Sequence, residues 1–360
     1  MGSVHASRVT AVRRILARER FDALLVTHLS NILYLCGFSG SSGALLVGRG
    51  RPVLFTDGRY SIQAREEASD VRVMIHPPSL FTAVGDFLRA RGRQRVGFEP
   101  AHLSVAQAGE LRSVSGKGIR WLPAASVVED LRAIKSPQEI ALIRGACRLA
   151  SQVFCDVLPQ VKPGVRELEL AAEIEHQMRR LGASGPSFET IVASGRRAAL
   201  PHARPTAKRL RKNELVVFDL GVILRHYCSD LTRTVYLGRA PRKIREWYRA
   251  VGEAQAAARQ ALRPGAATED VHAAARCVLE GHGLGRYFVH SLGHGLGLEV
   301  HEEPRLARGQ KRRVELGHVV TLEPGIYVPE VGGIRLEDDV AVLFHRTEVL
   351  TDAPRDFLEL

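Results

Sequence analysis

The sequence predicts two domains, an α/β domain at residues 1–126 and an α+β domain at residues 127–360. Three observations support this fold class. Short apolar runs and helical segments alternate before residue 126, whereas longer amphipathic helices follow it. In the second domain, the order helix, helix, strands and carboxylate-bearing hairpin occurs twice. A chain of 360 residues is also longer than one small hydrophobic core usually accommodates.

Elements of the first domain follow from apolar spacing and from turn residues. Val9, Val12 and Leu16 repeat at helical intervals, and the apolar runs after them are bounded by Gly and Ser. The expected elements are a helix at 8–20, strands at 23–27, 32–38, 43–48 and 51–57, helices at 62–68 and 80–91, and a strand at 95–100. This alternation is typical of an α/β domain and contains no evident catalytic cluster.

The second domain begins with a clear helix start. Ser136 is a capping residue, and Pro137 suits the first helical turn. The expected elements of the first half are helices at 136–158 and 166–181, a strand at 188–193 and a hairpin at 216–238. Those of the second half are helices at 242–262 and 268–281 and strands at 288–292, 319–322 and 334–343. We therefore expect two halves of similar organisation that share little sequence.

Composition favours an ordinary globular protein in a reducing compartment. Hydrophobic residues make up 45% of the chain and charged residues 25%, which is enough apolar material for a packed core. The five cysteines are scattered without a CxxC pair, so neither a disulfide framework nor a thiolate zinc site is expected. Because no signal-peptide core or membrane-spanning apolar run is present, we expect a cytoplasmic protein that does not enter a membrane.

The net charge of +12 raises the question of nucleic acid. The positive excess lies mostly before residue 126, as dispersed arginines without interleaved aromatic residues or a basic recognition helix. A solvated basic surface is the preferred interpretation, and a patch for nucleic acid or an acidic partner is the alternative. We expect no nucleic-acid partner.

The stretch VVFDLGVILRHYCSDLTRTVYLG places two carboxylates in the facing arms of a predicted hairpin. Asp219 and Asp230 each lie among apolar residues, where an isolated ionised carboxylate costs several kcal/mol to desolvate. Two such charges also repel each other. The pattern therefore indicates a positive group between the two arms.

The second half offers a matching pair of acids. Glu323 lies in VVTLEPGIYVP and Glu337 in GGIRLEDDV, each after a β-rich run. An arginine partner is the ordinary explanation for one buried glutamate, and Arg335 could serve Glu337 in this way. Four acids embedded in strand-like segments favour metal binding over a set of unrelated salt bridges.

A nitrogen ligand is expected from FVHSLGHGLGLEVHE, which contains His290, His294 and His301. The glycines between these residues argue against a helix and favour extended backbone close to a ligand. Carboxylates with one imidazole suit Mn²⁺, Co²⁺, Fe²⁺ or Zn²⁺. Two divalent ions would balance the four carboxylates and activate a water molecule.

The ordered motifs VVFDLG, SDLTRT, HGLGLEVHE, TLEPGIY and GIRLED resemble those of the pita-bread metallopeptidases, which include Xaa-Pro aminopeptidase, prolidase and methionine aminopeptidase. The resemblance covers residues 128–360 and implies a pita-bread catalytic domain. It also implies that two metal ions, with manganese the first expectation, are held by five side chains: Asp219, Asp230, His294, Glu323 and Glu337. NILYLCGFSGSSG and FTDGRYSIQA look like a creatinase-type N-terminal domain.

The same resemblance implies roles around the metal ions. His202, in SGRRAALPHARPT, matches a substrate-side histidine, and His290 and His301 match histidines that contact substrate and the tetrahedral intermediate. Arg335 matches an arginine near the prolyl site. Glu323 would carry a proton from water to the leaving nitrogen. Homodimers are common in the family, so a homodimer is expected.

The resemblance favours an Xaa-Pro aminopeptidase acting on proline-containing peptides. The nearest alternative is an Xaa-Pro dipeptidase, or prolidase. A metal-independent C–N hydrolase of creatinase type is a second alternative, although such relatives lack the complete ligand set. The remaining alternative is a non-catalytic pita-bread binding module, which would use the basic N-terminal half for an acidic partner.

Overall fold

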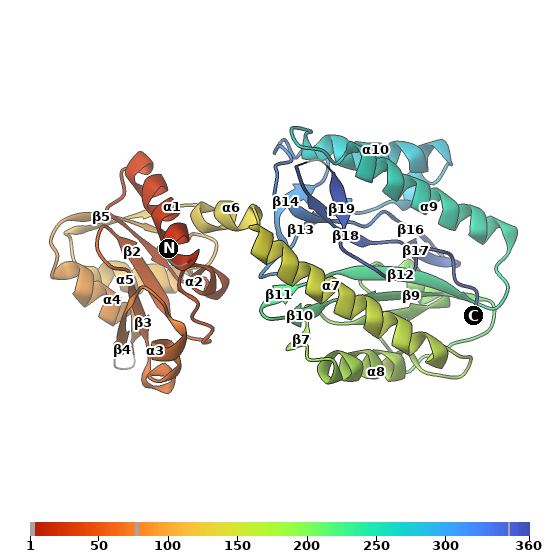
Figure 1. Cartoon of the computed structure of the whole chain (residues 1–360), viewed down its shortest axis with the longest axis horizontal. Coiled ribbons are helices and arrows are strands. Elements are labelled where there is room, and N and C mark those ends of the chain that lie inside the picture. Colours follow the sequence, from red (N-terminus) through yellow and green to blue (C-terminus); the bar gives the residue numbers. More distant parts are fainter. Residues whose placement is uncertain (1–3, 76–78, 345) are drawn as a thin grey trace. The chain divides into compact units, whose positions relative to one another are not determined.

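The computed structural model describes residues 4–75, 79–344 and 346–360, and the chain divides into two compact units (Figure 1). Unit 1 spans Met1–Arg132 and unit 2 spans Ala133–Leu360. Among the described residues, no helix combines the length and apolarity that crossing a bilayer requires.

Unit 1 is an α/β domain built on one mixed sheet. Its strands are β1 (Ala23–Val26), β2 (Ala44–Gly48), β3 (Val53–Thr56), β4 (Arg72–Ile75), β5 (Gln94–Phe98) and β6 (Ile119–Pro123), in the spatial order β4-β3-β2-β1-β5-β6. Its helices are α1 (Val4–Glu19), α2 (Leu29–Cys36), α3 (Gln63–Glu67), α4 (Leu80–Arg89), α5 (Val105–Ser115) and α6 (Val127–Ala133). The β1–β2 and β2–β3 pairs are antiparallel, and the other three pairs are parallel.

The strand predicted at residues 32–38 is wrong, because this segment forms most of helix α2. Ile32, Leu35 and Cys36 are all fully buried, at helical spacing, and Gly37 ends the helix in a left-handed conformation with φ 84°. The Gly37 N–H donates to the Leu33 carbonyl, as is usual at a helix C-terminus. A short apolar run satisfies both the strand pattern and the helix pattern, so its sequence alone does not separate them.

The first half of unit 2 contains two helices and the expected hairpin. Its elements are α7 (Pro137–Val157), α8 (Glu167–Arg180), β7 (Gly185–Pro186), β8 (Ile191–Ser194), β9 (Glu214–Leu220), β10 (Val222–Leu224), β11 (Tyr227–Cys228) and β12 (Leu231–Leu237). The helix start predicted at Ser136 is confirmed: the Ser136 hydroxyl accepts from the Glu139 N–H, and the Glu139 carboxylate accepts from the Ser136 N–H.

The second half repeats this order with two more helices and a second set of strands. Its elements are α9 (Arg242–Ala261), α10 (Thr268–Gly281), β13 (Gly293–Gly295), β14 (Glu302–Leu306), β15 (Val319–Leu322), β16 (Gly325–Val328), β17 (Gly332–Arg335), β18 (Asp338–Val342) and β19 (Thr347–Val349). Two strand predictions need correction. Residues 288–292 alternate between buried and exposed positions but form no strand: they follow the short helix at Gly285–Tyr287, and ladder pairing begins only at Gly293. The strand predicted at 334–343 is interrupted at Leu336 and Glu337.

In unit 2 the strands lie between two helix pairs (Figure 1). Helices α7 and α8 pack with the β9–β12 hairpin around Phe154, Ile174 and Phe218. Helices α9 and α10 pack on the strands of the second half around Val251, Val271 and Val320. The strands of each half are therefore packed against one helix pair on their outer side.

Each half contains a long antiparallel ribbon whose register sets the acid positions. In the first ribbon, Asp219 of β9 lies opposite Thr232 of β12. In the second ribbon, β15 pairs with β18 and β16 pairs with β17 in one continuous register, with Leu322 opposite Asp338 and Gly325 opposite Arg335. That register places Glu323 opposite Glu337 at the gap between the two paired segments.

Replacement of Gly295 by alanine should destabilise unit 2 by about 1–3 kcal/mol, because overpacking in a filled interior forces the backbone to shift. A Cβ at Gly295 would lie 2.2 Å from the Glu303 carbonyl oxygen. The matched control is Gly252→Ala in α9, where a Cβ meets nothing within 4 Å and helix propensity favours alanine by about 1 kcal/mol. Denaturant unfolding of both variants tests this expectation. Equal stability of the two would contradict the close packing of β13.

Candidate metal centre

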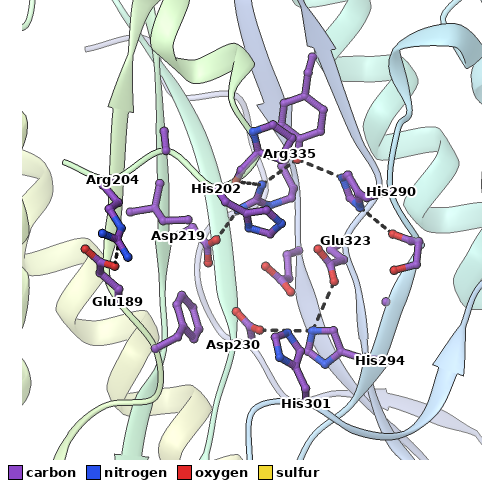
Figure 2. A pocket seen from close by; sticks show the side chains of 18 of the residues that line it. Glu189, His202, Arg204, Asp219, Asp230, His290, His294, His301, Glu323 and Arg335 are labelled. Carbon is purple, nitrogen blue, oxygen red and sulfur yellow. Dashed lines mark hydrogen bonds and ion pairs between the residues drawn. The ribbon is translucent and has the colours of Figure 1, made fainter. Parts of the chain in front are cut away.

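The five side chains expected to bind metal line one cavity of about 630 Å³ in unit 2 (Figure 2). They come from both ribbons and from the glycine-rich strand: Asp219 from β9, Asp230 from the residue before β12, His294 from β13, Glu323 from the residue after β15, and Glu337 from the gap between β17 and β18. The structure therefore brings together residues that are up to 118 positions apart (337 − 219).

Three of these side chains form the tightest group. Ligand atoms of Asp230, His294 and Glu337 all lie within 4.8 Å of one another. The His294 Nε2 atom is 3.4 Å from a Glu323 oxygen and 3.7 Å from an Asp230 oxygen. His294 Nδ1 lies 3.0 Å from the Gly295 carbonyl oxygen, to which it can only donate. This contact leaves the Nε2 lone pair directed at the carboxylates, as a metal ligand requires.

Only one of the two carboxylate oxygens of Asp219 is bonded to an arginine. Its Oδ2 atom accepts a hydrogen bond from Arg335 Nη2, whereas its Oδ1 atom is buried and has no partner in the described part of the chain. The sequence suggested Arg335 as a partner for Glu337, but the structure pairs it with Asp219. The Thr232 hydroxyl links Arg335 to Glu337 indirectly: it accepts from Arg335 Nε at 2.9 Å and donates to the Glu337 carboxylate at 2.5 Å.

Charge repulsion and burial dominate the electrostatics of this group. Burial, together with the neighbouring Glu337 and Asp219, raises the pKa of Asp230 well above its usual range. Burial and the nearby Glu323 raise the pKa of Glu337 in the same way. Burial raises the pKa of Glu323 to about 8 and lowers the pKa of His294 to about 4. Without a cation at neutral pH, Glu323 therefore retains a proton and the His294 imidazole is neutral.

These properties fit a site for divalent cations. Hard carboxylate oxygens and a neutral imidazole are suitable donors, and the unpartnered Asp219 oxygen supplies a further ligand atom. Two divalent ions would offset four negative charges, and the fifth ligand would add none. When bound, such ions would supply a nucleophilic water at neutral pH and polarise a carbonyl group.

Further polar side chains surround the cavity. The His290 Nε2 atom is 3.0 Å from the Tyr327 hydroxyl, which accepts from Arg335 Nη1 at 2.7 Å. Burial and the nearby Arg335 lower the pKa of His290 to about 4. His202 and His301 line the same cavity and are exposed. All four residues expected to contact substrate (His202, His290, His301 and Arg335) therefore border the space beside the acids.

Several residues that shape the site were missed by sequence reasoning. The sequence contains a signal for Thr232, which lies two residues after Asp230 and so shares a strand face with it. Tyr327 lies four residues after Glu323 and shares a face with it for the same reason. Arg233 and Asp339 gave no such signal. The Asp339 carboxylate accepts from the Asp230 N–H at 2.9 Å, so it holds the backbone of that acid.

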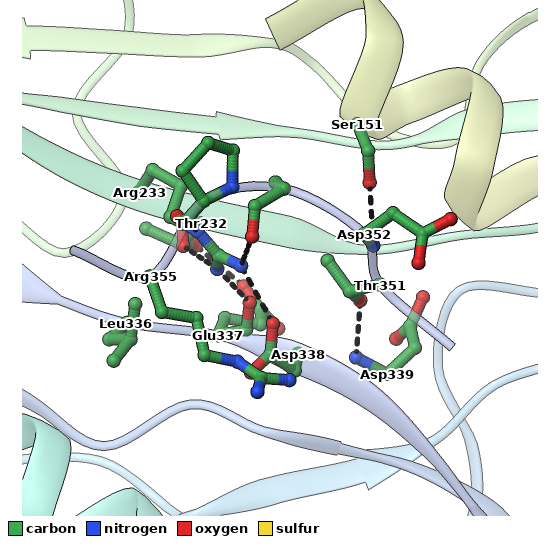
Figure 3. Close-up of polar contacts among 12 residues, drawn as sticks. Ser151, Thr232, Arg233, Leu336, Glu337, Asp338, Asp339, Thr351, Asp352 and Arg355 are labelled. Carbon is green, nitrogen blue, oxygen red and sulfur yellow. Dashed lines mark hydrogen bonds and ion pairs between the residues drawn. The ribbon is translucent and has the colours of Figure 1, made fainter. Parts of the chain in front are cut away.

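The Arg233 guanidinium supports Glu337 from behind (Figure 3). It donates to the Glu337 carbonyl oxygen at 2.6 Å and to the Asp338 carboxylate at 2.8 Å. Asp338 also accepts from Arg355 at 2.8 Å. Asp338, the acid next to Glu337, is thus neutralised by two arginines, whereas Glu323 and Glu337 face the cavity.

Two protein families match the chain. Residues 141–343 match metallopeptidase family M24, and residues 8–134 match the creatinase/prolidase N-terminal domain. The two matches cover most of both structural units.

Individual relatives match over nearly the whole chain. The Xaa-Pro dipeptidase of Pyrococcus horikoshii is 34% identical, and the alignment covers 98% of each protein. The solved structure of an Xaa-Pro dipeptidase from Bacillus anthracis is 34% identical, with a TM-score of 0.95 and coverage of 99% of this chain and 100% of the other. An X-Pro aminopeptidase from Thermotoga maritima is 31% identical, with a TM-score of 0.88 and coverage of 96% and 100%.

The metal-free protein should lose stability as the pH rises from about 7.5 to 8.5. Over this window Glu323 keeps a proton in the folded state that it has lost in the unfolded state, so unfolding releases protons. The histidines with lowered pKa values are largely neutral in both states there, because an unfolded histidine titrates near about 6.5, and they contribute little slope. Thermal unfolding of chelator-treated protein at several pH values measures the trend. Saturating Mn²⁺ should abolish this trend, because metal binding displaces those protons.

A flat or rising midpoint of the metal-free protein across this window would contradict the account. It would mean that the acids already lie ionised beside an internal counter-charge.

Proposed function

This chain belongs to metallopeptidase family M24, and we propose that it is an Xaa-Pro dipeptidase using two divalent metal ions. One observation carries the proposal: all five ligand-type side chains converge on a cavity that is also bordered by three further histidines and three arginines. The family and the relatives named above support a peptidase. The substrate is a dipeptide with proline in second position.

We favour the dipeptidase over the aminopeptidase that the motifs first suggested. The Xaa-Pro dipeptidases of Pyrococcus horikoshii and Bacillus anthracis match the chain over nearly its full length. The aminopeptidase remains the second candidate because the Thermotoga maritima structure also matches closely. The two activities differ in whether the proline carries a free carboxylate.

A free carboxylate needs a cation, and the cavity offers three arginines. Arg335 is paired with Asp219, and Arg204 is paired with Glu189 at 3.0 Å. Arg305 lines the cavity, is exposed, and has no carboxylate partner within residues 4–75, 79–344 and 346–360. We therefore assign Arg305 to the carboxylate of the substrate proline.

The other roles follow from the contacts already described. Asp219, Asp230, His294, Glu323 and Glu337 would hold the ions. Glu323, whose carboxylate accepts from the Thr321 hydroxyl at 3.3 Å, would also take a proton from water and return it to the proline nitrogen. The Ser291 carbonyl oxygen accepts from His290 Nδ1, and the Tyr327 hydroxyl donates to His290 Nε2. These two contacts would hold the neutral His290 ring beside the substrate. His202 and His301 would contact the rest of the substrate.

Several expectations stay predictions. Manganese is the proposed metal, since carboxylate-rich donor sets suit it. Residence in a reducing cytoplasm is supported by the cysteines, all five of which are free. The homodimer also remains a prediction.

Replacement of Glu323 by glutamine should lower kcat at least about 10³-fold, because the variant loses a metal ligand and a proton carrier. The fold should remain, since the change is isosteric at the cavity surface. The control is Glu330→Gln, which alters a surface ion pair that is about three-quarters exposed. Turnover of an Xaa-Pro dipeptide with saturating Mn²⁺ is the measurement. Near wild-type turnover by Glu323→Gln would remove Glu323 from the mechanism.

The dipeptide Ala-Pro should be cleaved with higher kcat/KM than the tripeptide Ala-Pro-Ala. Arg305→Met should raise KM for the dipeptide by about 10–100-fold, the cost of losing a hydrogen bond to a charged group, and should change the tripeptide little. Arg242→Met, at a side chain that is 92% exposed, is the control. Preference of the wild-type protein for the tripeptide would favour the aminopeptidase instead.

A further inference from the structure

The second ribbon loses a hydrogen bond where its two acids meet. Its continuous register puts Pro324 opposite Leu336, between the Leu322–Asp338 and Gly325–Arg335 pairs. The Leu336 N–H lies 3.4 Å from the Pro324 carbonyl oxygen. Proline has no N–H, so the reciprocal bond to the Leu336 carbonyl oxygen cannot form.

A side chain from helix α9 supplies the missing donor. Gln255 Nε2 donates to the Leu336 carbonyl oxygen at 3.2 Å and to the Leu322 carbonyl oxygen at 3.0 Å. Both N–H groups of the amide are thus used on two backbone carbonyls. Gln255 is only 7% exposed, and its helix neighbours Ala254 and Ala258 belong to the apolar core.

These two carbonyls belong to the residues immediately before Glu323 and Glu337. The peptide unit that accepts from Gln255 also contains the N–H of the following glutamate, so fixing the carbonyl fixes the plane from which each acid projects. The two acids lie opposite each other, where like charges repel and push the strands apart. A bond to both strands opposes that separation.

We infer that Gln255 is a positioning residue of the metal centre, which holds the Glu323 and Glu337 backbones at a fixed spacing across the proline gap. It touches neither metal nor substrate and acts through the two backbone carbonyls. The inference rests on the proposed metal centre.

Two variants separate this role from ordinary packing. Gln255→Met keeps the side-chain length but removes both donors. Alanine is unsuitable, because Gln255, Leu322 and Leu336 border a cavity of about 400 Å³ from which water could replace the amide. Val251→Ala is the matched control: it removes buried volume from the same helix at a fully buried position and leaves both carbonyls bonded.

The measurements are Mn²⁺ affinity of the full chain by calorimetric titration, the thermal midpoint of the metal-free protein, and kcat and KM with Ala-Pro. Gln255→Met should bind Mn²⁺ about 10–100-fold more weakly than wild type, as is typical when an outer partner of a metal site is removed. Its kcat should fall more than its KM rises. Val251→Ala should lose stability but bind Mn²⁺ as the wild type does.

Wild-type Mn²⁺ affinity in Gln255→Met, or an equal loss of affinity in Val251→Ala, would overturn the inference. If Gln255→Met does not fold, Gln255→Glu keeps the shape and replaces the donor, and it should show the same loss of affinity. Failure of both variants to fold would assign Gln255 to the fold and also overturn the inference. Absence of Mn²⁺ binding by the wild type would instead refute the proposed function.

Discussion

The repulsion among four buried carboxylates is the constraint on which this structure depends. Asp219, Asp230, Glu323 and Glu337 are drawn from two ribbons into one cavity, where burial opposes the ionisation of all four. At Asp230, Glu323 and Glu337 the neighbouring acids oppose it as well. A fold optimised only for stability would separate them or pair each with an arginine. Here one of the four has an arginine partner, and the others face a cavity large enough for ions and substrate.

The surrounding structure is organised to maintain this unfavourable arrangement. Helices on both sides pack the ribbons into fixed positions, so the acids cannot move apart without disturbing a core. Behind the acids, polar side chains hold the backbone: Asp339 at Asp230, Arg233 at Glu337, and Gln255 at the residues before Glu323 and Glu337. The packing of the fold thereby keeps the four acids close together, and bound cations would offset the repulsion among them.

Much of the fold and the list of acids could be predicted from the sequence. The Asp219 hairpin follows from two apolar runs on either side of a turn, the start of α7 from a capping box, and the end of α10 from the position of Gly281. Residues 32–38 were mistaken for a strand because a short apolar run suits either structure. The break in the second ribbon is also visible in the sequence, as Pro324, once the register is known.

The contacts between the two ribbons could not be predicted in this way. Arg335 pairs with Asp219, a residue 116 positions earlier, because the packing of β17 near β9 decides which acid it meets. Gln255 lies in a helix whose pattern marks it only as a polar residue on an apolar face. Contacts such as Arg335–Asp219 depend on how separate strands and helices pack against one another. The local propensity of a segment contains no information about that packing.

Anomalous X-ray scattering from crystals grown with Mn²⁺ tests the central claim most directly. The account predicts two strong peaks per chain, both in the cavity bounded by Asp219, Asp230, His294, Glu323 and Glu337. A cavity without peaks, or peaks only elsewhere on the chain, would contradict it.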